Sequence, residues 1–203
     1  MIASSIDIGT NSVLLLVAEV ADGQISVLKE LEAVPRLGRG VDENRTLHIE
    51  SQLRVLNVLN HYKSFLEENY PSTSQSTVVT ATSAVRDASN RDEFINLVAE
   101  RTGWNIRLLS GNEEAQTTYM GALSVLNDQQ SSNNLVFDIG GGSTELAFGE
   151  GRNLKQFVSI DMGSVRFTER FIKNYPPDDT AIELLRKSAK NTFKRKLSVS
   201  NRF

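Results

Sequence analysis

Two carboxylates, Asp138 and Glu145, flank a glycine-rich turn in the second half of the chain. A turn without bulky side chains lets several amide N–H groups and hydroxyls converge on one anion, and phosphate fits such a site best. Two carboxylates beside a phosphate would repel it without a cation between them, so we expect Asp138 and Glu145 to bind Mg²⁺. The alternative is a β-hairpin whose two acids face water. The turn residues that we expect to bind the phosphate are Gly140, Gly141, Gly142, Ser143 and Thr144.

The chain repeats this pattern near its N-terminus. Residues 7–14 align with residues 138–145, and each copy lies between two apolar runs. The repeat predicts two related lobes that grip one phosphate chain from both sides. Leu14 stands where Glu145 stands, so the two lobes are not chemically equal. In the first copy, the expected substrate-binding residues are Asp7, Gly9, Thr10, Asn11 and Ser12.

Arginine side chains offer further contacts to phosphate. Ser83 and Arg86 follow a short apolar run, where a strand is expected to open into a helix, and we expect both to bind substrate oxygens. The alternative for Arg86 is a surface ion pair with a neighbouring aspartate. Arg36 and Arg39 lie on a glycine-containing loop and either lean towards phosphate or remain solvated.

Two glutamates open the helix expected from residue 110 to about residue 126. Ser110 and Glu113 have the spacing of a capping box, which provides a structural role for Glu113. Glu114 lies about 100° further around the same turn of the helix and is our candidate for the catalytic carboxylate. A second capping box is expected from Asn90 to Glu93.

Four segments together resemble a known family. Both turns look like the phosphate motifs of the actin-like ATPase superfamily, which includes sugar kinases and actin. The full set is similar to the exopolyphosphatase and guanosine pentaphosphate phosphohydrolase branch, and the similarity extends to about Tyr175. In that family the second glutamate of the helix motif, here Glu114, is taken as the catalytic base. The segments are IDIGTNSVLLLV (6–17), ATSAVRDASN (81–90), LSGNEEA (109–115) and VFDIGGGSTEL (136–146).

The resemblance implies a Mg²⁺-dependent hydrolase that cleaves the terminal phosphoanhydride of inorganic polyphosphate or of guanosine pentaphosphate, the second of which belongs to the stringent response. Polyphosphate is weakly favoured, because a base pocket for the nucleotide is expected in a part of the family that this chain lacks. One alternative is a non-catalytic fragment that binds polyphosphate or an alarmone. An ATP-dependent kinase ranks last, since no adenosine-pocket loop is evident.

The order of elements predicts an α/β protein with a ribonuclease H-like (actin-like ATPase) fold. We expect one complete lobe, βββαβαβα, over residues 1–128 and the start of a second lobe, βββαα, over residues 129–203. The polar segment 127–134 is the expected boundary. The family pattern continues beyond the last helix, so the second lobe is interpreted as truncated. The basic residues near the C-terminus either bind polyphosphate or form a solvated helix end.

Composition narrows the class of protein. The 203 residues are 39% hydrophobic and 23% charged, with a net charge of −3, which gives no global attraction for nucleic acid. The chain has no cysteine, and neither a signal peptide nor a membrane-spanning segment is evident. We therefore expect a cytoplasmic protein without nucleic-acid or membrane partners, and leave open whether it forms a homodimer.

Overall fold

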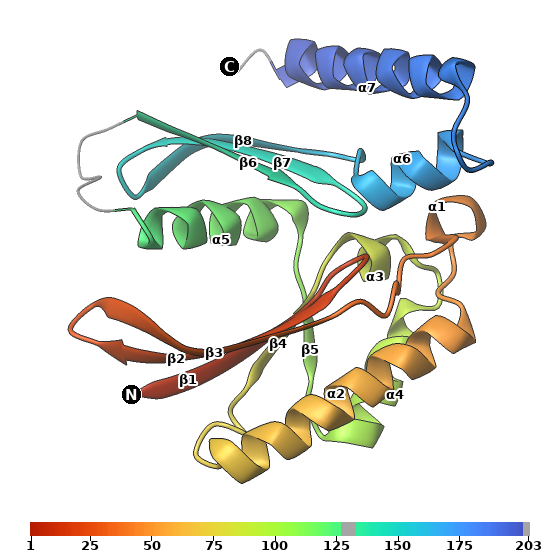
Figure 1. The fold of residues 1–203 in the computed structure, drawn as a ribbon. Helices are drawn as coiled ribbons and strands as arrows, with labels where there is room; N and C mark the ends of the chain where they lie inside the picture. The colour runs from red at the N-terminus through yellow and green to blue at the C-terminus, as the bar shows by residue number, and fades with distance from the viewer. Residues whose placement is uncertain (127–132, 201–203) are drawn as a thin grey trace. The chain divides into compact units, whose positions relative to one another are not determined.

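The computed structural model describes residues 1–126 and 133–200. By their internal contacts these residues form two compact units, Met1–Leu109 and Ser110–Phe203, which are labelled by element in Figure 1. The expected boundary at residues 128 and 129 lies in the segment 127–132, outside the described residues. The division into lobes 1–128 and 129–203 therefore stays a prediction.

The first unit contains a five-stranded mixed sheet in the order β3-β2-β1-β4-β5. The first three strands form the expected antiparallel meander, and β4 and β5 then add in parallel to β1. Parallel neighbours require crossover connections, which explains why helices separate these later strands in the sequence. The strands are β1 (Ile2–Ile8), β2 (Val13–Ala21), β3 (Gln24–Ala33), β4 (Val78–Ala81) and β5 (Ile106–Leu108).

Helices α2 and α4 cover one face of this sheet (Figure 1). Leu59 and Leu66 of α2 are fully buried with Ile6 and Leu15 of the sheet, and each such side chain stabilises the fold by about 1.5–3 kcal/mol. Apolar residues recur at helical spacing from His48 to Asn69 and predict a helix there. The structure confirms it as Ile49–Asn69, with His48 as its N-cap residue. The helices of this unit are α1 (Val41–Asn44), α2 (Ile49–Asn69), α3 (Ser83–Asp87) and α4 (Arg91–Thr102).

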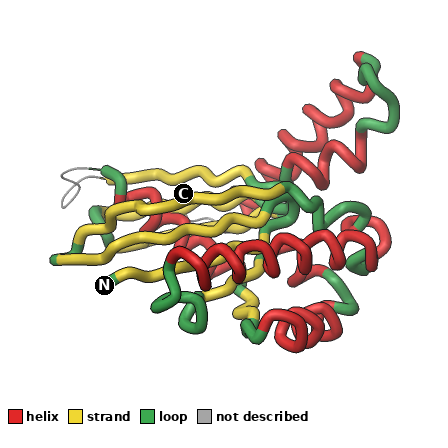
Figure 2. The backbone as a smooth tube through the Cα atoms, turned by 60° about the horizontal axis from the view of Figure 1, so that its bottom comes forward, coloured by secondary structure: helices red, strands yellow, loops and turns green. Residues whose placement is uncertain are grey.

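The second unit has a three-stranded antiparallel sheet in the order β6-β7-β8. Helix α5 contacts all three strands, and its Tyr119 and Leu123 pack with Ala147 of the central strand. Figure 2 shows the strands of the molecule in yellow and the helices in red. The elements are α5 (Gly111–Ser124), β6 (Asn133–Ile139), β7 (Thr144–Glu150), β8 (Asn153–Ile160), α6 (Ser164–Phe171) and α7 (Asp179–Ser200).

The two expected capping boxes have different outcomes. At the start of α5 both bonds of the box are present, with Ser110 accepting from the Glu113 amide and Glu113 accepting from the Ser110 amide. The box expected at Asn90 is wrong. Its side chain instead accepts from the amide of Leu47 and donates to the Leu47 carbonyl, so a tertiary contact replaces the local cap.

No helix among residues 1–126 and 133–200 has both the length and the hydropathy required to cross a bilayer.

Candidate functional site

The two glycine turns have the same internal geometry. The amide of Gly9 donates to the carbonyl of Ser12 over 2.9 Å, and the amide of Gly140 donates to the carbonyl of Ser143 over 3.0 Å. Each turn joins two antiparallel strands in the same register, so the residue before each turn pairs with the residue after it. The internal repeat inferred from the sequence is therefore confirmed as a structural repeat.

The second turn presents three consecutive amides to one side. The carbonyls of Gly140 and Gly141 accept from the amides of Ser164 and Arg166, and the carbonyl of Gly142 accepts from the Arg166 side chain. In a planar trans peptide the N–H points away from the C=O. The N–H groups that follow these three carbonyls, at positions 141–143, therefore point away from α6, and no hydrogen bond of the described residues uses them.

Helix α6 thus supports the turn on the side to which the turn carbonyls point. The amides of Ser164 and Arg166, in the first turn of this helix, hold carbonyls of the glycine turn and do not point to its anion-facing side. Arg166 is buried, and its Nε lies 2.6 Å from the Gly142 carbonyl oxygen. An arginine 24 residues from its acceptor carries no signal in the sequence that would reveal this contact.

The first turn is held by the loop that follows β3. The amide of Gly38 donates to the carbonyl of Thr10, and the amide of Arg36 donates to that of Asn11. By the same peptide geometry, the N–H groups of Asn11 and Ser12 point away from that loop. In each turn, at least two carbonyls accept hydrogen bonds from backbone amides of a segment later in the chain.

The predicted substrate hydroxyls of the first unit lie together. The hydroxyls of Thr10 and Ser83 are 2.9 Å apart, and both residues are buried. Thr80 donates to the carboxylate of Asp7 over 3.2 Å, beside the same turn. These contacts place Asp7, Thr10 and Ser83 around one end of the sheet.

Three residues of the second sheet form one row across its strands. Asp138 of β6 pairs directly with Glu145 of β7, and Glu145 pairs directly with Ser159 of β8. Directly opposed residues of an antiparallel sheet share a face, so all three side chains lie on the face that α5 covers. Ser159 donates to Glu145 over 2.7 Å, and Thr118 of α5 donates to Asp138 over 3.3 Å. The two acids predicted to bind metal are therefore neighbours.

Glu145 has an unusual environment for a carboxylate, since only 2% of it is exposed. Burial raises its pKa from about 4.5 to about 7, and repulsion by the charges of Glu114 and Asp138 adds to the rise. Hydrogen bonds from Ser159 and Ser143 oppose the rise. Glu114, in the first turn of α5, is thus close enough to Glu145 for their charges to interact.

This donor set fits a hard divalent cation. No group of three or more His, Asp or Glu residues in the described part of the chain could hold a metal ion by itself. Mg²⁺ does not need such a cage, because it keeps several waters and binds one or two carboxylates together with substrate phosphates. Asp138 and Glu145 repel each other when both are ionised, and a bound cation would relieve that repulsion.

The hydroxyl of Thr144 donates to the carbonyl of Met162. Thr144 precedes Glu145 in the strand, so its side chain lies on the opposite face of the sheet. Contact between this hydroxyl and phosphate would require the existing bond to break. Ser143, in contrast, is hydrogen-bonded to Glu145, on the acidic side.

The predicted arginines line two surface pockets of the first unit. Arg86 donates to the carbonyl of Leu109 over 3.0 Å and lines a pocket of about 420 Å³ together with Arg45 and Arg91. Asp87, an expected partner of Arg86 in the alternative interpretation, has an ion pair with Arg45.

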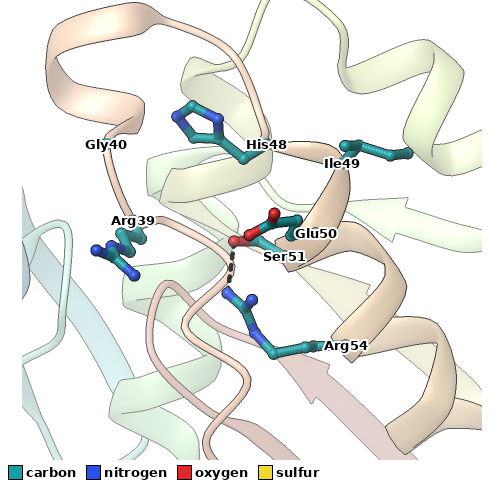
Figure 3. Close-up of a pocket in the computed structure, with 7 residues that line it drawn as sticks. All are labelled: Arg39, Gly40, His48, Ile49, Glu50, Ser51 and Arg54. Atoms are coloured by element: carbon teal, nitrogen blue, oxygen red, sulfur yellow. Dashed lines mark hydrogen bonds between the residues drawn. The ribbon is translucent and has the colours of Figure 1, made fainter.

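Arg39 lines a second pocket, of about 410 Å³, beside the first turn of α2. In Figure 3 the side chain of Arg54 reaches Ser51, to which it donates a hydrogen bond of 2.7 Å. His48 and Glu50 line the same pocket. The interpretation of Arg39 as a phosphate contact stays a prediction.

Sequence reasoning missed Ser159 and Thr118, which both donate a hydroxyl to the acidic pair. Neither follows from local spacing, because Ser159 meets Glu145 only through strand register and Thr118 meets Asp138 only through the packing of α5. The alternation of polar and apolar residues along β8 places Ser159 on a face, but does not identify its partner.

Residues 16–200 match the Ppx/GppA phosphatase family. This chain belongs to that family. Over 177 residues the Ppx/GppA chain is 39% identical to a bifunctional 3-dehydroquinate synthase/phosphatase of Fusobacterium nucleatum. This match covers 84% of the chain and 26% of that protein. It is 33% identical over 191 residues to a guanosine-5'-triphosphate,3'-diphosphate pyrophosphatase of Vibrio parahaemolyticus, covering 94% of the chain and 37% of that protein.

A solved structure of an exopolyphosphatase-like protein is also similar, with a TM-score of 0.89 and 31% identity, over 97% of this chain and 61% of that one. A structure of the Aquifex aeolicus PPX-GPPA enzyme is similar too, with a TM-score of 0.74 and 30% identity, over 96% of this chain and 64% of that one. The expected α/β class and actin-like ATPase fold are confirmed by these structural relatives. The chain spans less than two thirds of the length of each of these relatives.

Proposed function

We propose that this Ppx/GppA chain contributes the active site of a Mg²⁺-dependent phosphohydrolase that cleaves a terminal phosphoanhydride. The observation that carries the proposal is the acidic row of the second unit, where Asp138 and Glu145 flank a turn whose amides at 141–143 point away from α6, and where Glu114 is close to Glu145. Amides directed at one point bind phosphate oxygens, and paired acids bind the cation that such a phosphate needs.

Each group has a distinct task in the proposed reaction. Asp138 and Glu145 hold Mg²⁺, which neutralises charge on the phosphoryl group when bound. The amides of both turns, with Asn11, Ser12, Ser83 and Arg86, bind and orient the phosphate oxygens. Glu114 accepts a proton from the attacking water at its carboxylate. Phosphoryl transfer depends mainly on positioning and charge stabilisation, so these groups are sufficient in kind.

The substrate class follows from the relatives and from the chemistry of the turns. One relative is named for guanosine-5'-triphosphate,3'-diphosphate and a structural relative is called exopolyphosphatase-like. Both substrate classes end in a phosphoanhydride that the two turns would bind in the same way. Our proposal favours inorganic polyphosphate, because the site residues recognise phosphate and none is assigned to a base.

The proposal is tested by phosphate release with Mg²⁺ from long-chain polyphosphate, guanosine pentaphosphate and ATP, measured side by side. Glu114→Gln should lower kcat by roughly 10²–10⁴, because the general base is lost while the shape of the side chain is kept. Glu150→Gln is the matched control, since Glu150 lies at the exposed end of β7. Removal of Mg²⁺ by EDTA should abolish release.

Full Mg²⁺-dependent release by Glu114→Gln would refute the assignment of the base. Binding of polyphosphate by calorimetry, without release of phosphate over hours, would favour the alternative of a non-catalytic binding fragment. ATP turnover stimulated by an acceptor would instead indicate a kinase.

A further inference from the structure

We infer that Ser159 is a positioning residue of the proposed metal site, which fixes the carboxylate of Glu145 and sets the distance between that carboxylate and helix α5. The inference rests on the proposed function, because it gives Ser159 a purpose only if Glu145 binds a cation. Three observations carry it.

The first observation is the hydrogen bond between Ser159 and Glu145. The serine hydroxyl lies 2.7 Å from Oε1 of Glu145, and the two residues are direct partners across β7 and β8. A carboxylate has about four lone-pair sites, so the bonds from Ser159 and Ser143 leave acceptor capacity for a cation. The bond from Ser159 therefore orients the Glu145 carboxylate and leaves other lone pairs of that carboxylate available to a cation.

The second observation is the close approach of helix α5 to the same serine. A Cβ atom added at Gly111, the first residue of α5, would lie 3.2 Å from the Cβ of Ser159, which is tighter than ordinary contact. The helix therefore begins against β8 at this point. Glu114 follows about 4.5 Å further along the helix axis, so the contact of Gly111 with Ser159 places Glu114 near Glu145.

The third observation comes from the internal repeat. The equivalent row of the first unit is Asp7, Leu14 and Glu32, with an apolar residue in the central position and no hydroxyl in the third. The repeated fold thus forms without a serine in this position. The hydroxyl of Ser159 occurs in the row that has a carboxylate, Glu145, at its centre. This points to the site and not to the fold as the reason for the serine.

The test is the affinity of the full chain for Mn²⁺, a spectroscopic substitute for Mg²⁺, measured by electron paramagnetic resonance and calorimetry. Ser159→Ala should weaken Mn²⁺ binding by about 10–100-fold, as expected for loss of a group that orients a metal ligand. Ser124→Ala is the matched control and should bind as the wild type does, because this serine lies at the end of α5 and donates to the Gly121 carbonyl of its own helix. In a Glu145→Gln background, Ser159→Ala should have no further effect on affinity.

The outcomes separate this inference from the proposed function. Wild-type affinity in Ser159→Ala, together with loss of binding in Glu145→Gln, overturns the inference and leaves the proposed metal site intact. Wild-type binding in Glu145→Gln, or no binding by the wild type, refutes the metal site itself and the inference with it. If Ser159→Ala does not fold, Ser159→Cys, which is nearly isosteric but a weaker donor, must still bind Mn²⁺ more weakly than wild type; equal affinity overturns the inference.

Discussion

Glu145 shows at the scale of one residue why an acid in this position needs a functional explanation. A buried carboxylate beside two other acids costs stability when ionised, and a hydrophobic side chain would avoid that cost. In the first unit the equivalent position of the sheet holds Leu14, which is 43% exposed, so the repeated fold does not itself require a buried acid there. The presence of Glu145 is therefore consistent with a cation-binding role that offsets the cost.

The raised pKa of Glu145 predicts a pH dependence of stability in the absence of metal. A raised pKa means that the folded state holds the proton more tightly than the unfolded state does. The stabilisation is therefore fully present below about pH 4.5 and is lost as the pH rises through about 7. The loss should reach at most about 3 kcal/mol. Urea unfolding in EDTA at several pH values measures it.

Glu145→Gln should remove this part of the pH dependence, whereas Glu150→Gln, an exposed glutamate on the same strand, should leave it unchanged. Saturating Mg²⁺ should reduce the loss in the wild type, because the cation favours the ionised carboxylate. A pH profile that is identical in Glu145→Gln and wild type would contradict the assigned environment.

At the scale of elements, the first turn of α6 supports the glycine turn by donating backbone hydrogen bonds to its carbonyls. Gly163 is the N-cap residue of α6, and a Cβ atom there would collide with the backbone of Gly141 and lie 2.6 Å from the amide nitrogen of Gly142. Backbone atoms cannot rotate away as a side chain can. Glycine is therefore required at position 163 for α6 to hold the carbonyls of the turn.

Gly163→Ala should separate α6 from the turn and destabilise the chain by about 1–3 kcal/mol, as overpacking does. It should also weaken phosphate binding, because the amides at positions 141–143 lose their common direction. Chemical denaturation and calorimetry with polyphosphate check the two effects. The control is Gly121→Ala within α5, where a Cβ atom meets nothing within 4 Å; it should stabilise the helix by up to about 1 kcal/mol. Equal stability of both variants would contradict the argument.

At the scale of the molecule, two copies of one turn carry different chemistry. In the second unit the central residue of the row is Glu145, which accepts a hydrogen bond from Ser159, while the equivalent row of the first unit has Leu14 at its centre. We propose that the second unit holds the cation and that the first contributes phosphate donors. The repeated backbone then serves two different tasks on one substrate.

This division predicts that one ligand protects both turns from hydrogen exchange. With Mg²⁺ and polyphosphate at about 100 times Kd, the amides of Asn11 and Ser12 and those at positions 141–143 should exchange up to about 100-fold more slowly. The measurement uses Glu114→Gln, which keeps the substrate intact. Protection of only one turn would contradict a shared phosphate, and protection without Mg²⁺ would contradict the role of the cation.

Much of the fold follows from local pattern. The β-branched and leucine-rich run over residues 13–20 predicts a strand, which is observed as Val13–Ala21. The helix expected over residues 48–69 is observed as Ile49–Asn69. Both are long, strongly patterned segments in which side-chain period and packing agree. The capping box expected at Asn90 is absent because the side-chain amide of Asn90 is hydrogen-bonded to the backbone of Leu47. Local spacing in the sequence does not reveal this tertiary contact.

The sequence by itself determined the repeated turns, the flanking acids and the capping role of Glu113, because each depends on residues within one short segment. It also led to the prediction of Glu114 as the catalytic carboxylate. Only the tertiary structure decided what faces Glu145. Strands β7 and β8 contain a register shift at Phe148 and Gly149. Without that bulge, the pairing nearer the β7–β8 turn would continue and place Val158 opposite Glu145. The extra residue moves the register by one, and a shift of one exchanges the two faces of a strand, so a hydroxyl meets the buried carboxylate.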